Sequence, residues 1–120
     1  IVVLSATFKL KEKNQILISN DMKYYKNKRR ESQPNDLSLG SVFKKHQNIG
    51  AGYYIENCGL KGKTCGGCKV SEKHANFIIN IGDATSNDYA DLVKICQNNV
   101  YDKYNIQLER EVKYFGEFIF

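Results

Sequence analysis

The stretch "TCGGCKVSEKHANFIINIGDATSNDYADLVKICQNNVYDKY" (64–104) carries the clearest structural signals in this chain of 120 residues. In its second half, 85–104, apolar side chains recur at intervals of three and four residues, the pattern of a helix with one apolar face. That face consists of Tyr89, Leu92, Val93, Cys96 and Val100. Thr85 or Ser86 is the expected N-cap, and Asp88 falls in the first turn. The pattern predicts a helix that packs into a core, with Cys96 as a core residue.

The first half of the stretch predicts two strands. "TCGGCKVS" (64–71) and "ANFIINIG" (75–82) are joined by the short polar segment "EKH", which is typical of strands bounded by a turn. The glycine pair Gly66-Gly67 predicts a bulge or a close approach of another backbone segment.

Toward the N-terminus, "IVVLSATFKLK" (1–11) is rich in β-branched and apolar residues and predicts a strand. Residues 14–30 have apolar side chains at helical spacing and end in "KYYKNKRR", where cations suit a helix C-terminus. "ESQPNDLSLG" (31–40) contains the only proline and predicts a loop. "SVF" (41–43) predicts a short strand or a strand-like entry to a loop.

The remaining segments complete a mixed pattern. "AGYYIENCGLKG" (51–62) predicts a short helix closed by Gly59. "IQLEREVKYFGEF" (106–118) alternates and predicts a final strand. The order strand, helix, strand, helix, two strands, helix, strand predicts an α+β fold in which helices pack on one face of a small, largely antiparallel sheet.

Length, hydropathy and net charge limit the classes of protein to which the chain can belong. The chain is long enough for one domain with a modest core, and no apolar run approaches the ~20 residues of a membrane span. The net charge of +5 and the pI near 9.0 favour anionic partners, but the bias is mild and a solvated lysine-rich face is the favoured explanation. The chain opens on Ile1 without a basic segment typical of signal peptides. We therefore expect a piece of a longer protein.

Four cysteines, Cys58, Cys65, Cys68 and Cys96, are expected to be reduced thiols in the cytoplasm. Cys65 and Cys68 have C-x-x-C spacing, so a zinc or thiol-redox site remains an alternative. A structural zinc site usually needs a second close pair of ligands, and the sequence offers none.

"GSVFKK" (40–45) is the first candidate for chemistry. Ser41 is not part of a G-x-S-x-G motif, which argues against a hydrolase nucleophile. A serine hydroxyl can act as a general acid beside a cationic group, and Lys44, Lys45 and His46 could supply that charge or bind phosphate. The alternative is a small polar strand residue.

Carboxylates and polar turn residues are further candidates. Glu109 and Glu111 share one face of the predicted last strand, either as solvated residues or as a general acid or orienting base. "SEKHANF" (71–77) places Lys73, His74 and Asn76 in a turn, where binding residues often lie although polar turn residues also serve solubility alone. The sequence has neither a P-loop nor a G-x-G-x-x-G motif, so nucleotide binding by those routes finds no support.

Seven pieces in order resemble the C-terminal, substrate-binding domain of the UDP-N-acetylenolpyruvoylglucosamine reductase family, the flavoenzymes of early bacterial peptidoglycan synthesis. They cover nearly the whole chain, and no single motif is strong. They are "ATFKL" (6–10), "RRESQP" (29–34), "GSVFK" (40–44), "AGYYIENCGLKG" (51–62), "GGCKVSEKHANFIIN" (66–80), "DATSNDYADL" (83–92) and "LEREVKYFGEF" (108–118).

The resemblance implies roles for five residues. Ser41 matches the family's general acid, which protonates carbon 2 of the enolpyruvyl group after hydride reaches carbon 3. Glu111 matches the active-site glutamate of the last strand. Arg30, Lys45 and His74 match positions that contact the substrate. The sequence departs from the family at His46, where proline is usual, and at Cys68, where a small alanine is usual.

The resemblance also implies partners and cofactors. The substrate would be UDP-N-acetylglucosamine enolpyruvate, and FAD and NADPH would serve the full-length enzyme. The flavin-binding domains are absent from this chain, which we therefore expect to bind no FAD and to be inactive alone. Residues 1–12 would be the last strand shared with those domains. We expect a cytoplasmic protein that binds neither nucleic acid nor membrane, with a basic polyanion-binding module as the alternative.

Overall fold

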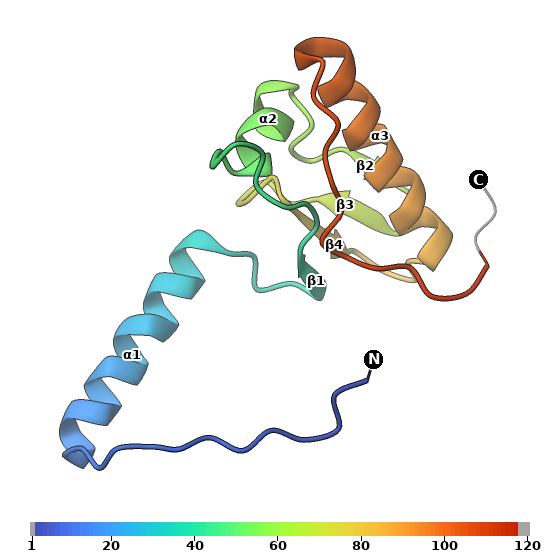
Figure 1. Cartoon of the computed structure of the whole chain (residues 1–120). Helices are drawn as coiled ribbons and strands as arrows, with labels where there is room; N and C mark the ends of the chain where they lie inside the picture. The colour runs from blue at the N-terminus through green and yellow to red at the C-terminus, as the bar shows by residue number, and fades with distance from the viewer. Residues whose placement is uncertain (1, 118–120) are drawn as a thin grey trace. The chain divides into compact units, whose positions relative to one another are not determined.

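The chain divides into two units, the first ending at Glu31 and the second beginning at Ser32. The computed structural model describes residues 2–117, and Figure 1 colours them from blue to red along the chain. Each unit is organised around its own contacts.

The first unit consists of an extended segment and a helix. Residues 2–14 form neither helix nor strand, and their side chains are exposed. The predicted strand 1–11 is therefore wrong over its described residues, and residue 1 lies outside them. A strand needs a neighbour that accepts and donates its backbone hydrogen bonds, and no described strand pairs with this segment.

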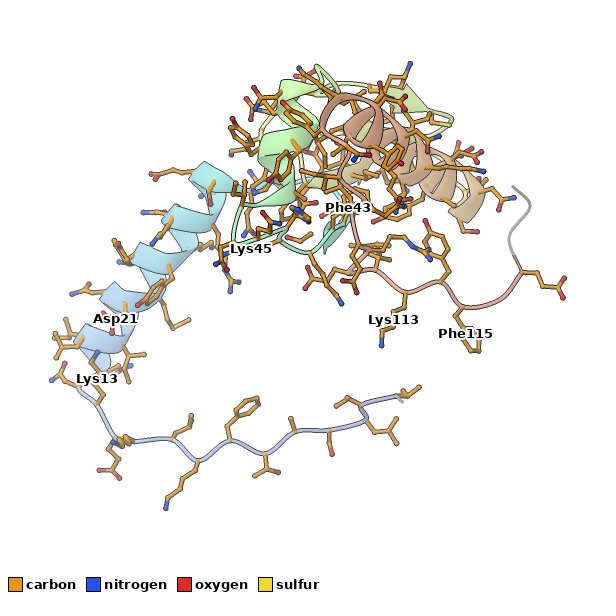
Figure 2. The ribbon with its side chains drawn as sticks, turned by 45° about the horizontal axis from the view of Figure 1, so that its top comes forward. Lys13, Asp21, Phe43, Lys45, Lys113 and Phe115 are labelled. Atoms are coloured by element: carbon orange, nitrogen blue, oxygen red, sulfur yellow. The ribbon has the colours of Figure 1, made fainter. Side chains whose placement is uncertain are left out.

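Helix α1 (Gln15–Ser32) confirms the helix expected over 14–30. At its start, the Asn14 side chain accepts a hydrogen bond from the backbone N–H of Ile16 at 2.9 Å. Lys13 forms an ion pair with Asp21, and both are labelled in Figure 2. No residue of α1 is buried, so the helix is held by local bonds rather than by a core of its own.

The second unit is built on one four-stranded sheet. Its strands are β1 (Ser38–Ser41), β2 (Thr64–Cys65), β3 (Cys68–Val70) and β4 (Phe77–Asn80). They lie in the order β1-β4-β3-β2, and every neighbouring pair is antiparallel.

Two helices complete the second unit. They are α2 (Ala51–Asn57) and α3 (Ser86–Tyr104). Helix α3 packs against β2 and β3, and α2 packs against α3, so both helices lie on one side of the sheet (Figure 1). The predicted α+β fold with an antiparallel sheet is confirmed.

The ends of α2 and α3 match the sequence signals. Gly59 follows α2 with φ of 72°, and its N–H donates to Glu56 O at 2.9 Å while the N–H of Leu60 donates to Ile55 O at 3.3 Å. These two bonds form a Schellman motif. Thr85, one of the two N-caps that the sequence allows, caps α3 and forms a reciprocal capping box with Asp88.

The strand predictions are less accurate. The loop expected over 31–40 contains most of β1. The pairing of β1 with β4 shifts register between Ser38 and Ser41, and Gly40, with φ of 83°, accommodates this irregularity. "TCGGCKVS" is a hairpin of two strands rather than one. The strand predicted over 106–118 is reduced to a single bridge between Phe43 and Arg110, and residue 118 lies outside the described residues.

The core lies between the sheet and α3. Val70 of β3, Ile55 of α2, and Leu92 and Val100 of α3 are fully buried. Cys96 is 1% exposed, which confirms its prediction as a core residue. Figure 2 shows Phe43 inside this unit, where it is 2% exposed.

Leu92→Ala should lower the free energy of unfolding by about 2–5 kcal/mol, because it leaves a cavity in a close-packed core. Urea unfolding of the chain measures this. Lys94→Ala, on the exposed side of α3, should change the same quantity by less than about 0.5 kcal/mol. Equal effects of the two changes would contradict this packing.

Asp88 should make stability depend on pH in one direction. Hydrogen bonds from the backbone of Thr85 and of Gly67, then from the Thr85 side chain, hold the pKa of Asp88 below its usual 3.8. A carboxylate with a lowered folded pKa stabilises the fold above its usual pKa and loses that contribution as pH falls through the lowered value. The difference in unfolding free energy between wild type and Asp88→Asn should therefore be constant near neutral pH and shrink below pH 3.8.

Candidate active site

Ser41 is held at the end of β1 by its neighbours. It is paired with Phe77 of β4 and is only partly exposed. The next residues, Val42 and Phe43, are 1% and 2% exposed, and the N–H of Val42 donates to Asn76 O at 2.9 Å. Because apolar side chains anchor the segment immediately after Ser41, the serine has little freedom to move along the strand.

The side chain of Asn76 replaces a strand partner for Phe43. Asn76 is 6% exposed. Its Oδ1 accepts from the Phe43 N–H at 3.0 Å, and its Nδ2 donates to Phe43 O at 2.9 Å. Both backbone groups of a buried residue are thereby satisfied, so the loop after Ser41 is fixed without a regular ladder.

The segment 109–112 runs on the other side of this loop. The N–H of Lys44 donates to Glu109 O at 2.9 Å, and the N–H of Glu111 donates to Val42 O at 2.8 Å. These bonds bring Glu111 beside Ser41. The two residues line one hollow of about 410 Å³, together with Leu39, Val112 and Lys113.

The hollow has charges of both signs at its wall. Glu111 and Lys113 are exposed, and Figure 2 shows Lys113 pointing outward from the red segment. A hydroxyl, a carboxylate and an ammonium group in one hollow can bind a polar ligand, transfer a proton and stabilise the negative charge that a transfer leaves.

A second cavity of about 390 Å³ adjoins the hollow. The two share Leu39, Val112 and Lys113, and the second cavity extends past Cys68 to Tyr89. The Tyr89 hydroxyl is buried without a hydrogen-bond partner among the described residues. Burial raises the pKa of Tyr89 and keeps the hydroxyl protonated. This cavity offers a ligand both apolar contacts and polar side chains, among them the Tyr89 hydroxyl.

His74 lies close to the site but does not line the hollow. Its Nδ1 accepts from the Asn76 N–H at 3.2 Å, and its ring packs edge-on against Phe77 with centroids 4.9 Å apart. A Cβ added at Gly52 would lie 3.3 Å from His74 Cε1 and 3.4 Å from Asn76 N, so the start of α2 approaches this hydrogen bond closely. His74 thus connects the start of α2 to Asn76, and the hydrogen bond leaves the proton of the neutral ring on Nε2.

Lys45 also does not line the hollow, and Arg30 belongs to the first unit. Lys45 is exposed, as Figure 2 shows. It precedes a tight turn in which His46 and Ile49 exchange backbone bonds of 2.9 Å and Gln47 and Asn48 have φ of 47° and 68°. Arg30 lies in the last turn of α1, which belongs to the first unit.

Several lysines are paired with carboxylates. Lys44 forms an ion pair with Glu109, Lys61 with Glu56 at 2.6 Å, and Lys69 with Glu72 at 3.5 Å. The positive charge of the second unit is thus partly balanced locally.

Among the described residues, no three His, Cys, Asp or Glu side chains are grouped as metal ligands. None of the described helices is long and apolar enough to cross a bilayer.

Comparison with known proteins identifies the domain that carries this site. Residues 33–115 match the family model of UDP-N-acetylenolpyruvoylglucosamine reductase, C-terminal domain. The chain belongs to this family. The reductase of Caldicellulosiruptor bescii is 45% identical over 120 residues, covering 98% of this chain and 38% of the relative. That of Lactobacillus acidophilus is 44% identical over 117 residues, covering 97% of this chain and 39% of the relative.

A solved structure agrees with the sequence matches. The crystal structure of the reductase from Thermus caldophilus superposes with a TM-score of 0.69 at 35% identity, covering 86% of this chain and 37% of that one. The chain therefore spans less than two fifths of these relatives, and has the fold of their C-terminal domain.

Sequence reasoning missed two residues of this site. The sequence places Asn76 in a polar turn, although a lone amide between apolar Ala75 and Phe77 also indicates a buried polar role. Lys113 was not singled out, although it has the same strand parity as Glu111. Both signals are local and readable from the sequence.

Asn76→Ala should lower the free energy of unfolding by about 2–5 kcal/mol, since each of the two buried Phe43 backbone groups left without a partner costs about 1–3 kcal/mol. Hydrogen exchange at the Phe43 amide should accelerate more than exchange at the amides of α3. Asn98→Ala, at an exposed position of α3, serves as the control. Unchanged exchange at Phe43 would show that the amide does not hold this loop.

Proposed function

We propose that this chain is the substrate-binding and proton-donating domain of a UDP-N-acetylenolpyruvoylglucosamine reductase that acts in bacterial peptidoglycan synthesis. The observation that carries the proposal is the shared hollow of Ser41 and Glu111. These are the two residues that match the family's catalytic positions. Two segments about seventy residues apart in sequence meet there through the bonds of Val42 and Lys44.

In the proposed reaction, the enolpyruvyl double bond gains a hydride at carbon 3 and a proton at carbon 2. FAD, reduced by NADPH, supplies the hydride in the whole reductase, and we assign both cofactors to its other domains. Ser41 Oγ donates the proton to carbon 2. The pair of electrons left on Ser41 must then be stabilised until a proton returns from solvent.

The residues around Ser41 suit that task. We assign Lys113, which lines the same hollow, to favouring the serine alkoxide, because a nearby positive charge lowers the cost of forming an anion. Glu111 is placed to hold the enol-like intermediate or to assist return of the proton to Ser41. Arg30, Lys45 and His74 are assigned to the substrate, the two cations to its diphosphate.

The cellular setting follows from the same proposal. The substrate is a sugar nucleotide, which is made and used in the cytoplasm, and the four cysteines of the chain are free thiols, as expected in a reducing compartment. We propose no nucleic-acid or membrane partner. The partners are the substrate and the flavin-binding domains of the reductase, without which the chain should not oxidise NADPH.

The test uses the longer protein that includes the flavin-binding domains. Ser41→Ala should lower substrate-dependent NADPH oxidation by about 10²–10⁴-fold, the range expected for loss of a general acid, while NADPH still reduces the flavin. Ser38→Ala, at the other end of β1, is the matched control and should leave turnover nearly unchanged. Full activity of Ser41→Ala would overturn the assigned role, and an inert wild type with a reducible flavin would overturn the proposed substrate.

A further inference from the structure

We propose that Cys65 and Cys68 form a reversible disulfide, so that the hairpin between β2 and β3 is a site of oxidative modification. This inference does not rest on the proposed function. It rests on the placement of two free thiols at the two ends of the shortest hairpin turn in the sheet.

The two cysteines are direct partners across the hairpin. Cys65 ends β2, Cys68 begins β3, and they face each other in the antiparallel register. Directly opposed residues of antiparallel strands have Cα atoms about 4.5–5.5 Å apart, within the range of about 4.4–6.8 Å found for disulfides. Their Cβ atoms lie on the same face at about 4.5–5.5 Å and need to approach by less than about 1 Å to reach bonding geometry.

The turn between them can accommodate this small movement. Gly66 and Gly67 form the whole connection, and Gly66 has φ of 51°. Glycine adopts such angles without steric cost. The turn is also held in place, because the Gly67 N–H donates to Asp88 Oδ2 at 3.3 Å and its carbonyl accepts from the Ile81 N–H at 2.9 Å. The thiols are therefore kept opposite each other.

The two thiols differ in solvent exposure, which determines which of them reacts first. Cys65 is partly exposed, whereas Cys68 is 2% exposed. A peroxide is the oxidant class that fits this arrangement. The Cys65 thiolate attacks one peroxide oxygen, the O–O bond breaks, and the sulfenic acid of Cys65 forms with loss of one water. The Cys68 sulfur then attacks the Cys65 sulfur, the S–O bond breaks, and a second water leaves with the Cys68 proton. In sum, two thiols and one hydrogen peroxide give one disulfide and two waters.

The other two cysteines provide an internal comparison. Cys58 follows α2, and Cys96 is 1% exposed within α3. Burial raises the pKa of Cys96 to about 12, which leaves it without thiolate character at neutral pH. We expect oxidation to be selective for the pair in the hairpin.

The experiment treats the reduced 120-residue chain with hydrogen peroxide, blocks the remaining thiols with iodoacetamide under denaturing conditions, and digests it with trypsin. Cleavage after Lys63 and Lys69 yields the peptide 64–69, which contains both cysteines and no other residue able to form a disulfide. That peptide should be unalkylated and lighter by two hydrogens. Dithiothreitol should restore the reduced mass, since a small strained ring is readily reduced.

Matched variants separate this bond from other oxidation. Cys65→Ser should abolish the loss of two hydrogens from peptide 64–69, and Cys58→Ser should leave it intact. A disulfide that joins the Cys58 and Cys96 peptides, a disulfide between two chains, or sulfinic acid at Cys65 with Cys68 still alkylated would each overturn the proposal.

Discussion

The hydrogen bonds between the Asn76 side chain and both backbone groups of Phe43 are the contact on which the candidate site depends. Their lengths are 3.0 and 2.9 Å, and both residues are buried. After β1, the chain leaves the regular ladder, and without these bonds two polar groups would lie in the core unsatisfied, a cost that proteins avoid. The amide therefore allows a loop to cross the core while Ser41 stays at its edge. The same loop then pairs with segment 109–112 and brings Glu111 into place.

Features set by local interactions could be predicted from the sequence, whereas features set by long-range pairing could not. Helix α3 was predicted almost to the residue, because its apolar spacing and its capping box are local. The end of α2 was also predictable, since Gly59 satisfies a local backbone requirement. The failures concern pairing. Residues 1–11 and 106–118 both have strand-like composition. A strand also needs a neighbouring strand to pair with, and composition does not show whether such a partner is present.

The candidate site shows the same division. Physical reasoning on Ser41 alone favours a small polar strand residue, because no catalytic partner is near it in sequence. Its catalytic assignment came from the family resemblance, and the bonds of Val42 with Glu111 then gave a physical reason for two distant segments to meet. Lys113 and Asn76 were readable from parity and from a polar residue in an apolar run. They were overlooked because single polar residues of exposed type are common in loops.

The hairpin at Cys65 and Cys68 and the hollow at Ser41 are connected by a shared wall. Cys68 lines the second cavity, and that cavity shares Leu39, Val112 and Lys113 with the hollow. A bond between Cys65 and Cys68 would therefore alter the wall of a cavity that Val112, the neighbour of Glu111, also lines. Close-packed interiors transmit small displacements to the groups that touch them, so we expect the state of the hairpin to affect the shape of this shared wall.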